Sequence, residues 1–434
     1  MNVKKVAINL ISQVDKGAYS NIALNETFKT LDINSKEKAF ITEIFYGVIR
    51  NKKFLDYIIE KNTKEIKKEW IRNLLRISIY QITFMDSDDK GVVWEGTELA
   101  KKYSIAISKF INGTLRNYLR NKDSELKNLA DEKNYEVLYS IPKWFYNILE
   151  KQYRNENLKQ AITSLKKVPY LSVRVNKLKY TEKEFEEFLK EKDIQIIKKV
   201  DTVYYINSGL IINSEEFKTG KIIAQDASSY LAAKNLEVIP NELVLDICAA
   251  PGGKTAVLAE QMENKGEIIA IDIHQHKIKL IDTNMKKLGI DIVKAIVMDA
   301  RNVNKQGRKF DKILVDVPCS GYGVIRKKPE ILYFKNRESV EELAKLQLEI
   351  LNSAADILKD GGELIYSTCT ITDEENTNNI KKFLEDRKEF KVEKLYIPEN
   401  VSGDYDKLGG FCINYKEEIM DNFYIIKLVK GEKC

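Results

Sequence analysis

The stretch that decides the fold is LVLDICAAPGGKTAVLAE, residues 243–260. The run LVLDI predicts a short strand, and the spacing of apolar residues from Thr255 onward predicts a helix. Between them lies a loop of small residues with two glycines, which lets backbone amides approach a ligand closely. Because a helix N-terminus favours negatively charged groups, the stretch predicts an α/β fold that binds a nucleotide-like ligand at this loop.

Strands alternate with helices outward from this stretch along the second half of the chain. We expect strands at IIAID (268–272), KAIVM (294–298), KILVDV (312–317), ELIYS (363–367) and FYIIKLV (423–429), and helices near 276–288, near 338–359 and after Asp373. This alternation predicts a parallel, doubly wound, Rossmann-like sheet. Ligands of such sheets bind beyond the carboxyl ends of the strands.

The first part of the chain has a helical pattern. From residue 3 to about 130, apolar residues return every three or four positions, as in KAFITEIFYGVIRNKKFLDYIIE (38–60). This spacing predicts an all-α domain. The polar stretch RNKDSELKNLADEKN (120–134) is either a linker or the continuation of an exposed helix.

A mixed pattern connects the two halves. From Pro169 onward we expect strands at YLSVRVNKL (170–178), TVYYI (202–206) and GLIIN (209–213), with a helix opened by Thr181. The chain should therefore contain three parts. These are an all-α domain over residues 1–130, a small mixed α/β connecting subdomain over 131–220, and an α/β domain over 221–434.

Composition limits the class of protein. The 434 residues are 44% hydrophobic and 31% charged, which is typical of a folded chain, and the net charge of +6 permits a nucleic-acid partner without requiring one. No stretch approaches the ~20 apolar residues of a membrane helix, and the N-terminus lacks a signal-peptide core. Five cysteines without a CxxC pair indicate free thiols in a reducing cytoplasm. The two histidines have no ligand spacing with a cysteine pair, so we expect no metal site.

Reactive side chains occupy the ends of the expected strands. Asp246, Asp272 and Asp316 lie at the carboxyl ends of three strands. Cys319, in VDVPCSGYG, and Cys369, in IYSTCTI, follow two strands closely. Because the carboxyl ends of parallel strands meet at one edge of a sheet, we expect these five residues to converge.

Two ligands compete for the first loop. A P-loop would require glycine where Cys248 stands, although Gly253, Lys254 and Thr255 match its pattern. A cofactor with an adenosine and an amino-acid tail would instead place Asp272 on the ribose hydroxyls. The missing first glycine favours the second ligand.

Three motifs now suggest a family. DICAAPGGKT (246–255), DVPCSGYGVIRKKPE (316–330) and YSTCTITDEEN (366–376) together resemble the S-adenosylmethionine-dependent RNA cytosine-C5 methyltransferases, over residues 141–434. The helical stretches EKAFITEIFYGVIRNKKFLD, IRNLLRISIYQITFM and FINGTLRNYLR resemble the NusB-type RNA-binding domain. Their fusion is similar to bacterial 16S ribosomal RNA methyltransferases of the RsmB/Fmu/Sun type.

The resemblance implies a cofactor site and a substrate. The residues expected to bind S-adenosylmethionine through the first loop are Cys248, Ala249, Ala250, Pro251, Gly252, Gly253 and Lys254. Asp272 would hold the ribose, Asp299 would lie near the adenine, and Asp316 would sit between the methionine moiety and the target base. The implied partner is a single-stranded or loop region of 16S ribosomal RNA, with no membrane and no obligate protein partner.

Chemistry explains why two thiols are needed. Carbon 5 of cytosine is a poor nucleophile, so a thiolate must first add to carbon 6, helped by nearby positive charge from the cofactor sulfonium and Lys254. A second polar group can assist when the proton on carbon 5 and the thiol depart. The residues alone leave the two roles open, and the resemblance assigns attack to Cys369 and release to Cys319. Cys248 is expected to pack within its loop, and Cys412 and Cys434 are expected to be incidental.

Other functions remain as alternatives. The chain could methylate a cytosine in transfer RNA or 23S ribosomal RNA instead. A P-loop ATPase would bind ATP and no methyl donor, and a non-catalytic RNA-binding protein would leave the paired cysteines without a role.

Overall fold

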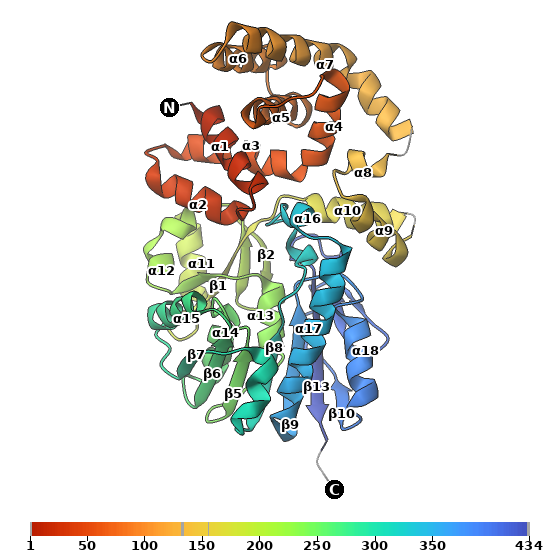
Figure 1. Ribbon diagram of the computed structural model, residues 1–434. Helices are drawn as coiled ribbons and strands as arrows, with labels where there is room; N and C mark the ends of the chain where they lie inside the picture. Colours follow the sequence, from red (N-terminus) through yellow and green to blue (C-terminus); the bar gives the residue numbers. More distant parts are fainter. Residues whose placement is uncertain (1, 132–133, 155, 432–434) are drawn as a thin grey trace. The chain divides into compact units, whose positions relative to one another are not determined.

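The computed structural model describes residues 2–131, 134–154 and 156–431, and the chain divides into two compact units. The first unit comprises Met1–Lys166 and Lys327–Asn336, and the second comprises Lys167–Arg326 and Arg337–Cys434. Both units are labelled by element in Figure 1. Among the described residues, no helix combines the length and the apolar character that crossing a lipid bilayer requires.

Every regular element described in the first unit is a helix, as the apolar spacing predicts for residues 3–130 (Figure 1). These helices are α1 (Val3–Asp15), α2 (Ser20–Thr30), α3 (Ser35–Arg50), α4 (Lys52–Asn62), α5 (Glu69–Phe84), α6 (Asp89–Lys101), α7 (Ile105–Asp131), α8 (Tyr135–Leu138), α9 (Lys143–Gln152), α10 (Glu156–Lys166) and α16 (Ile331–Phe334). Phe45, Leu74 and Leu115 pack into one core from three of them. The polar stretch after residue 120 continues helix α7 as far as Asp131, which is the second of the two alternatives.

A ten-residue segment, Lys327–Asn336, leaves the second unit and belongs to the first. Within the first unit, the buried carboxylate of Glu330 accepts a hydrogen bond from the backbone N–H of Ser20, the first residue of α2, at 2.9 Å. The hydroxyl of Tyr333 lies 3.3 Å from Oγ of Ser140, and the Lys52 ammonium lies 5.3 Å from the centroid of the Tyr333 ring. The helical unit therefore binds a segment that follows the expected Cys319 loop directly in the sequence.

The second unit begins with a small antiparallel sheet of strand order β2-β3-β1-β4. Its elements are β1 (Leu171–Val175), α11 (Glu182–Glu191), β2 (Ile196–Val200), β3 (Val203–Ile206), η1 (Leu210–Asn213), α12 (Glu215–Lys218) and β4 (Ile222–Ala224). Thr181 caps α11 as expected, with its side chain accepting from the backbone N–H of Glu184. The expected strand at 209–213 is wrong. Only Ile211 is buried there, and the stretch forms a 3₁₀ turn because a short apolar run without a strand partner does not require extended backbone.

A larger sheet follows, with strand order β11-β12-β13-β9-β8-β5-β6-β7, and β10 also pairs with β13. Its elements are α13 (Ala227–Lys234), β5 (Leu243–Ile247), α14 (Gly253–Gln261), β6 (Glu267–Asp272), α15 (Gln275–Leu288), β7 (Val293–Val297), η2 (Ala300–Gln306), β8 (Phe310–Asp316), η3 (Tyr322–Val324), α17 (Arg337–Asp356), β9 (Leu358–Thr368), α18 (Thr377–Asp386), β10 (Phe390–Glu393), β11 (Asp404–Tyr405), β12 (Phe411–Ile413) and β13 (Phe423–Lys430). Five neighbouring strands are parallel, as predicted, and in sheet order these are β7, β6, β5, β8 and β9. The last strand, β13, instead pairs antiparallel with β9, so the sheet is mixed.

Both faces of the larger sheet are covered. On one face Val244 of β5 packs with residues of α13, α14 and α15, and on the other Leu245 packs with residues of α17 and α18. Alternate residues of a strand point to opposite faces, so a sheet buried on both sides needs apolar side chains at successive positions. The strand order reverses between β5 and β8, and in such folds the carboxyl edge at this point is where ligands bind.

Candidate active site

The loop after β5 turns directly into helix α14. Gly252 precedes the helix with φ of 98°, a left-handed conformation that favours glycine, and a Cβ there would lie 2.9 Å from Cε of Met285. The helix begins at Gly253, two residues before the expected start, so the first glycine pair forms its N-terminus. Thr255 Oγ1 donates to Oδ2 of Asp246 at 2.6 Å and joins the first turn of the helix to the strand.

Two groups at this loop, the buried carboxyl of Asp246 and the partly buried thiol of Cys248, have raised pKa values. Burial raises the pKa of Asp246 to about 7, against the hydrogen bond from Thr255. Burial, followed by nearby carboxylates, raises the pKa of the Cys248 thiol to about 12. Cys248 is therefore a neutral thiol at physiological pH, in keeping with a packing role. Burial also raises the pKa of Cys412 to about 12, and Cys434 lies outside the described residues.

Asp272 and Asp299 follow the next two strands. The buried carboxylate of Asp272 accepts from the backbone N–H of His274 at 3.2 Å and lies 3.4 Å from the Lys277 ammonium. Asp299 caps η2 and pairs with Arg301 at 2.6 Å, and this hydrogen bond lowers the pKa of Asp299. Asp272 therefore lies at the end of β6, whereas the carboxylate of Asp299 is already paired with the Arg301 guanidinium.

The two cysteines of the expected site meet. Sγ of Cys319, after β8, lies 3.1 Å from Sγ of Cys369, after β9. The hydrogen bond between the sulfurs, together with burial, raises the pKa of Cys319 well above its ordinary value. Cys319 therefore keeps its proton at physiological pH.

A partly buried ion pair lies beside the thiols. The Lys254 ammonium is 2.8 Å from Oδ2 of Asp316, and Ser367 Oγ donates to Oδ1 of the same carboxylate at 2.7 Å. Burial alone would lower the pKa of Lys254, but Asp316, with a smaller contribution from Cys369, raises it above its ordinary value. The ammonium therefore stays charged next to the thiol pair and 5.5 Å from the centroid of the Phe423 ring.

Comparisons with known proteins cover the same parts. Models of the NusB family match residues 1–120, of the RsmF/B-like ferredoxin-like domain 141–215, and of the 16S rRNA methyltransferase RsmB/F 233–429. The chain is 33% identical over 413 residues to the probable ribosomal RNA small subunit methyltransferase B of Bacillus subtilis (strain 168), covering 92% of each chain. This chain belongs to the RsmB/F methyltransferase family.

Two further relatives extend over nearly the whole length. The ribosomal RNA small subunit methyltransferase B of Vibrio vulnificus is 32% identical over 440 residues, covering 99% of this chain and 100% of the relative. The crystal structure of PH0851 matches with a TM-score of 0.83 at 30% identity, covering 100% of this chain and 99% of that one. The fold of this RsmB/F chain is thus shared from the helical part to the last strand, and S-adenosylmethionine is its methyl donor.

The loop of this RsmB/F chain fits that donor. Gly252 and Gly253 stand at the N-terminus of α14 without side chains, and the free backbone N–H groups of a helix N-terminus suit a carboxylate. The buried amide nitrogen Nε2 of Gln225 has no hydrogen-bond partner among the described residues and lies 3.5 Å from where a Cβ of Gly253 would stand. Gln225 was not expected from the sequence, because it precedes the motif stretch and reaches the loop only through the fold. When bound, S-adenosylmethionine supplies an electrophilic methyl group, and these residues, with Asp272, are those that would hold it.

Glu375 organises the loop of Cys319 and was also missed. Its buried carboxylate accepts from the backbone N–H of Ser320 at 2.8 Å, from Thr372 Oγ1 at 2.7 Å and from Gln347 Nε2 at 2.9 Å. Breaking any of these hydrogen bonds would leave a buried donor or acceptor without a partner, which costs free energy. Ser320 follows Cys319 directly, so the network holds the backbone next to one thiol.

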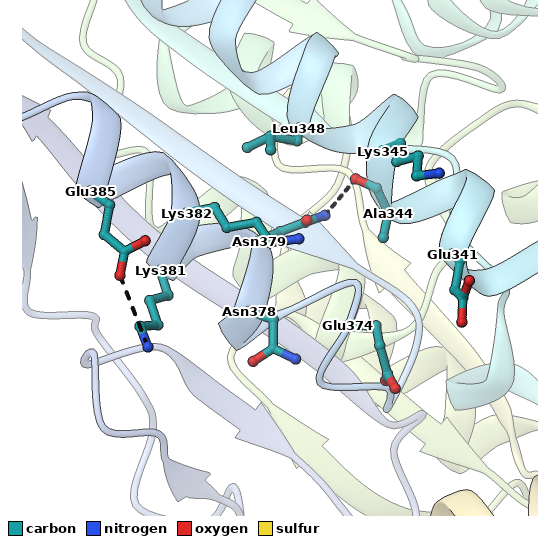
Figure 2. Close-up of a pocket in the computed structure, with 10 residues that line it drawn as sticks. All are labelled: Glu341, Ala344, Lys345, Leu348, Glu374, Asn378, Asn379, Lys381, Lys382 and Glu385. Atoms are coloured by element: carbon teal, nitrogen blue, oxygen red, sulfur yellow. Dashed lines mark hydrogen bonds and ion pairs between the residues drawn. The ribbon is translucent and has the colours of Figure 1, made fainter.

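The same network extends to a groove between α17 and α18. Asn379 donates to Oε1 of Gln347 at 3.1 Å and to the carbonyl oxygen of Ala344 at 2.9 Å, the second of which is drawn in Figure 2. The groove has a volume of about 450 Å³, and its lining includes lysine and glutamate side chains from both helices (Figure 2). None of the residues expected at the active site lines it.

Gly323 fastens the two cysteine loops together. Its N–H donates to the carbonyl oxygen of Cys369 at 2.9 Å, and its own carbonyl accepts from the N–H of Asn422 at 3.1 Å. A Cβ on Gly323 would stand 2.0 Å from the carbonyl oxygen of Asn422, well inside van der Waals contact. The chain can pass this close only without a side chain.

Proposed function

We propose that this chain transfers a methyl group from S-adenosylmethionine to carbon 5 of a cytosine in 16S ribosomal RNA, through a covalent bond between Cys369 and the base. The observation that carries the proposal is the pair of sulfurs 3.1 Å apart beside the Lys254–Asp316 ion pair. A single reactive thiol would serve many reactions. Two thiols held together match a reaction in which one adds to the base and another assists its release.

In the proposed reaction Cys369 is the nucleophile. Its thiolate adds to carbon 6 of the cytosine, which moves electron density onto carbon 5 and allows that carbon to accept a methyl group. The Lys254 ammonium keeps its charge and would attract the negative charge of the attacking sulfur. Asp316 holds that ammonium in place and would lie between the methyl donor and the base.

Cys319 is proposed to act after the methyl group is transferred. The proton on carbon 5 must leave, the double bond between carbons 5 and 6 must form again, and the bond from Sγ of Cys369 to carbon 6 must break. A protonated Cys319 beside Cys369 can donate its proton to the departing sulfur of Cys369, and the Cys319 thiolate left behind can accept the proton from carbon 5, so that both thiols end protonated. The raised pKa of Cys319 supports this role, because a thiol that keeps its proton cannot compete as nucleophile.

The proposed substrate is a single-stranded or loop region of the RNA. A cytosine inside a duplex cannot present carbons 5 and 6 to a partly buried thiol, which supports this choice. In this proposal residues 1–130 form an RNA-binding domain, 131–220 a connecting subdomain and 221–434 the methyltransferase domain. The enzyme would act in the cytoplasm without an obligate protein partner.

Mapping 5-methylcytosine by bisulfite sequencing tests this function. Ribosomal RNA from cells with and without the gene is compared, and we expect one cytosine of 16S RNA to lose its methyl group when the gene is absent. Unchanged 16S RNA with a lost site in transfer RNA or 23S RNA would move the activity to that substrate. Saturable ATP binding by the purified chain without binding of S-adenosylmethionine would contradict the proposal.

Replacing Asp272 by alanine is expected to weaken binding of S-adenosylmethionine by roughly 1–3 kcal/mol, the scale of a lost hydrogen bond to a charged acceptor. The proposed ribose contact of Asp272 would be removed, while its neighbours His274 and Lys277 remain. Titration calorimetry on the full chain measures the effect. Asp282→Ala removes the same charge from an exposed position on α15 and should leave the affinity unchanged. Equal affinity of Asp272→Ala and the wild-type chain would exclude Asp272 from the cofactor site.

A further inference from the structure

Three tyrosine rings of the first unit form a stack that the proposed reaction does not use. Tyr135 begins α8, Tyr139 is the C-cap of that helix, and Tyr146 lies on α9. The ring of Tyr135 lies 6.0 Å from that of Tyr139 and 6.1 Å from that of Tyr146 between centroids, with interplanar angles of 25° and 17°. All three side chains are only partly buried. The rings are therefore nearly parallel and still open to a ligand on their outer faces.

The stack lines the wall of a cavity of about 630 Å³. A fourth aromatic ring, Tyr153, lines the same cavity, as does the buried side chain of Ile162. Such a volume is in the range of known small-ligand sites and accommodates one or two nucleobases. Tyrosines that served only to fill a core would have no cavity of this size beside them, because interiors pack closely.

The charged residues of the cavity suit nucleotides. Arg154 and Lys159 are exposed at the cavity and can contact phosphates, and Arg154 can also stack on a base. Glu150 and Glu156 would repel a phosphate, but a carboxylate accepts hydrogen bonds from the exocyclic amino groups of bases. Burial, and then the neighbouring Glu150, raises the pKa of Tyr146, so its ring stays uncharged. Both signs of charge therefore have a partner on an unpaired nucleotide, whereas a bare phosphate would meet the carboxylates.

We propose that the cavity lined by Tyr135, Tyr139, Tyr146 and Tyr153 binds one or two unpaired nucleotides of the RNA substrate, whose bases stack on the tyrosine rings. This site rests on the proposed function for its RNA partner, but it is separate from the thiol pair. Stacking on aromatic rings tolerates any base, so the site would hold the single strand without reading its sequence. It would add affinity for single-stranded over double-stranded RNA.

Fluorescence titration of the full chain with a single-stranded oligoribonucleotide carrying 2-aminopurine tests the proposal. We expect the wild-type chain to quench the fluorescence, because the fluorophore stacks on tyrosine. Tyr146→Ala and Tyr135→Ala should each bind about tenfold more weakly, as expected for one lost base–aromatic stack. Tyr146→Phe and Tyr135→Phe keep the ring and should bind like the wild-type chain. The control Tyr103→Ala removes a tyrosine that is 54% exposed in the same unit but outside the cavity, and should leave binding unchanged.

Further readings separate folding, site and function. Binding of S-adenosylmethionine and the midpoint of thermal unfolding, measured on each variant, reveal any variant that fails to fold. Affinity of Tyr146→Ala equal to wild type, while the wild-type chain methylates RNA, would overturn the site alone. If Tyr146→Ala binds RNA more weakly but the wild-type chain methylates no cytosine, the proposed function is overturned and the binding site is retained. If Tyr146→Ala binds naked RNA normally but no longer binds the small ribosomal subunit, the cavity binds a protein partner and the RNA proposal is overturned.

Discussion

Replacing Cys369 by alanine is expected to abolish methylation and to leave no covalent complex between protein and RNA. The reason is that the bond to carbon 6 cannot form without its sulfur. Replacing Cys319 by alanine is expected to have the opposite appearance. Its Cys369 thiolate still attacks and the base still receives the methyl group, but release stalls, so protein linked to methylated RNA accumulates. Denaturing gel electrophoresis with labelled RNA distinguishes the two variants in one experiment.

A third variant controls for the loss of a thiol as such. Cys412→Ala removes a half-buried cysteine of β12 that contacts neither Cys319 nor Cys369 by any hydrogen bond described above, and it should methylate like the wild-type chain. A trapped complex with Cys369→Ala and none with Cys319→Ala would exchange the two roles. No complex in either variant would remove the release role of Cys319.

The second large effect is expected from a substitution that changes no reactive group. Gly323→Ala places a Cβ 2.0 Å from the carbonyl oxygen of Asn422, so the backbone of one cysteine loop must move away from the other. Overpacking of this kind costs about 1–3 kcal/mol or more, and a shift of about 1 Å at reacting groups can reduce a rate about 100-fold. We expect at least that loss in the rate of methyl transfer, measured with saturating RNA and methyl donor.

Two measurements identify the cause of this loss. The backbone of Gly323 donates to Cys369 and accepts from Asn422, and neither residue belongs to the loop after β5. Binding of S-adenosylmethionine should therefore be retained in Gly323→Ala. Gly209→Ala adds the same methyl group where no atom lies within 4 Å and should keep full activity. If Gly323→Ala methylates at the wild-type rate, the close approach of the two loops is not required for the reaction.

The convergence of strand ends could be predicted because it follows from local patterns. Apolar runs separated by helical stretches define parallel strands, and parallel strands share a carboxyl edge, so the two cysteines meet although fifty residues separate them. The capping residue Thr181 was equally local. The resemblance to a family supplied the roles of the cysteines, which the spacing of the residues left open.

The parts that could not be predicted depend on contacts between distant residues. The antiparallel direction of β13 is defined by its pairing with β9, which apolar content alone does not encode. Gln225 and Glu375 became visible only when the fold brought them to the loops after β5 and β8. The strand predicted at 209–213 was wrong for a related reason. Its apolar residues fit a turn as well as a strand, and only the fold shows which of the two forms.

The segment Lys327–Asn336 has a consequence for how the protein can be divided. The chain passes between the two units after Lys166, after Arg326 and after Asn336, so no single cut yields two self-contained pieces. A truncated enzyme that starts at residue 167 would keep Glu330 and Tyr333 but lose Ser20, Ser140 and Lys52, leaving a buried carboxylate and an aromatic ring exposed to water. The helical unit therefore cannot be removed without loss. Its removal would first destabilise the segment Lys327–Asn336, which follows the Cys319 loop in the sequence.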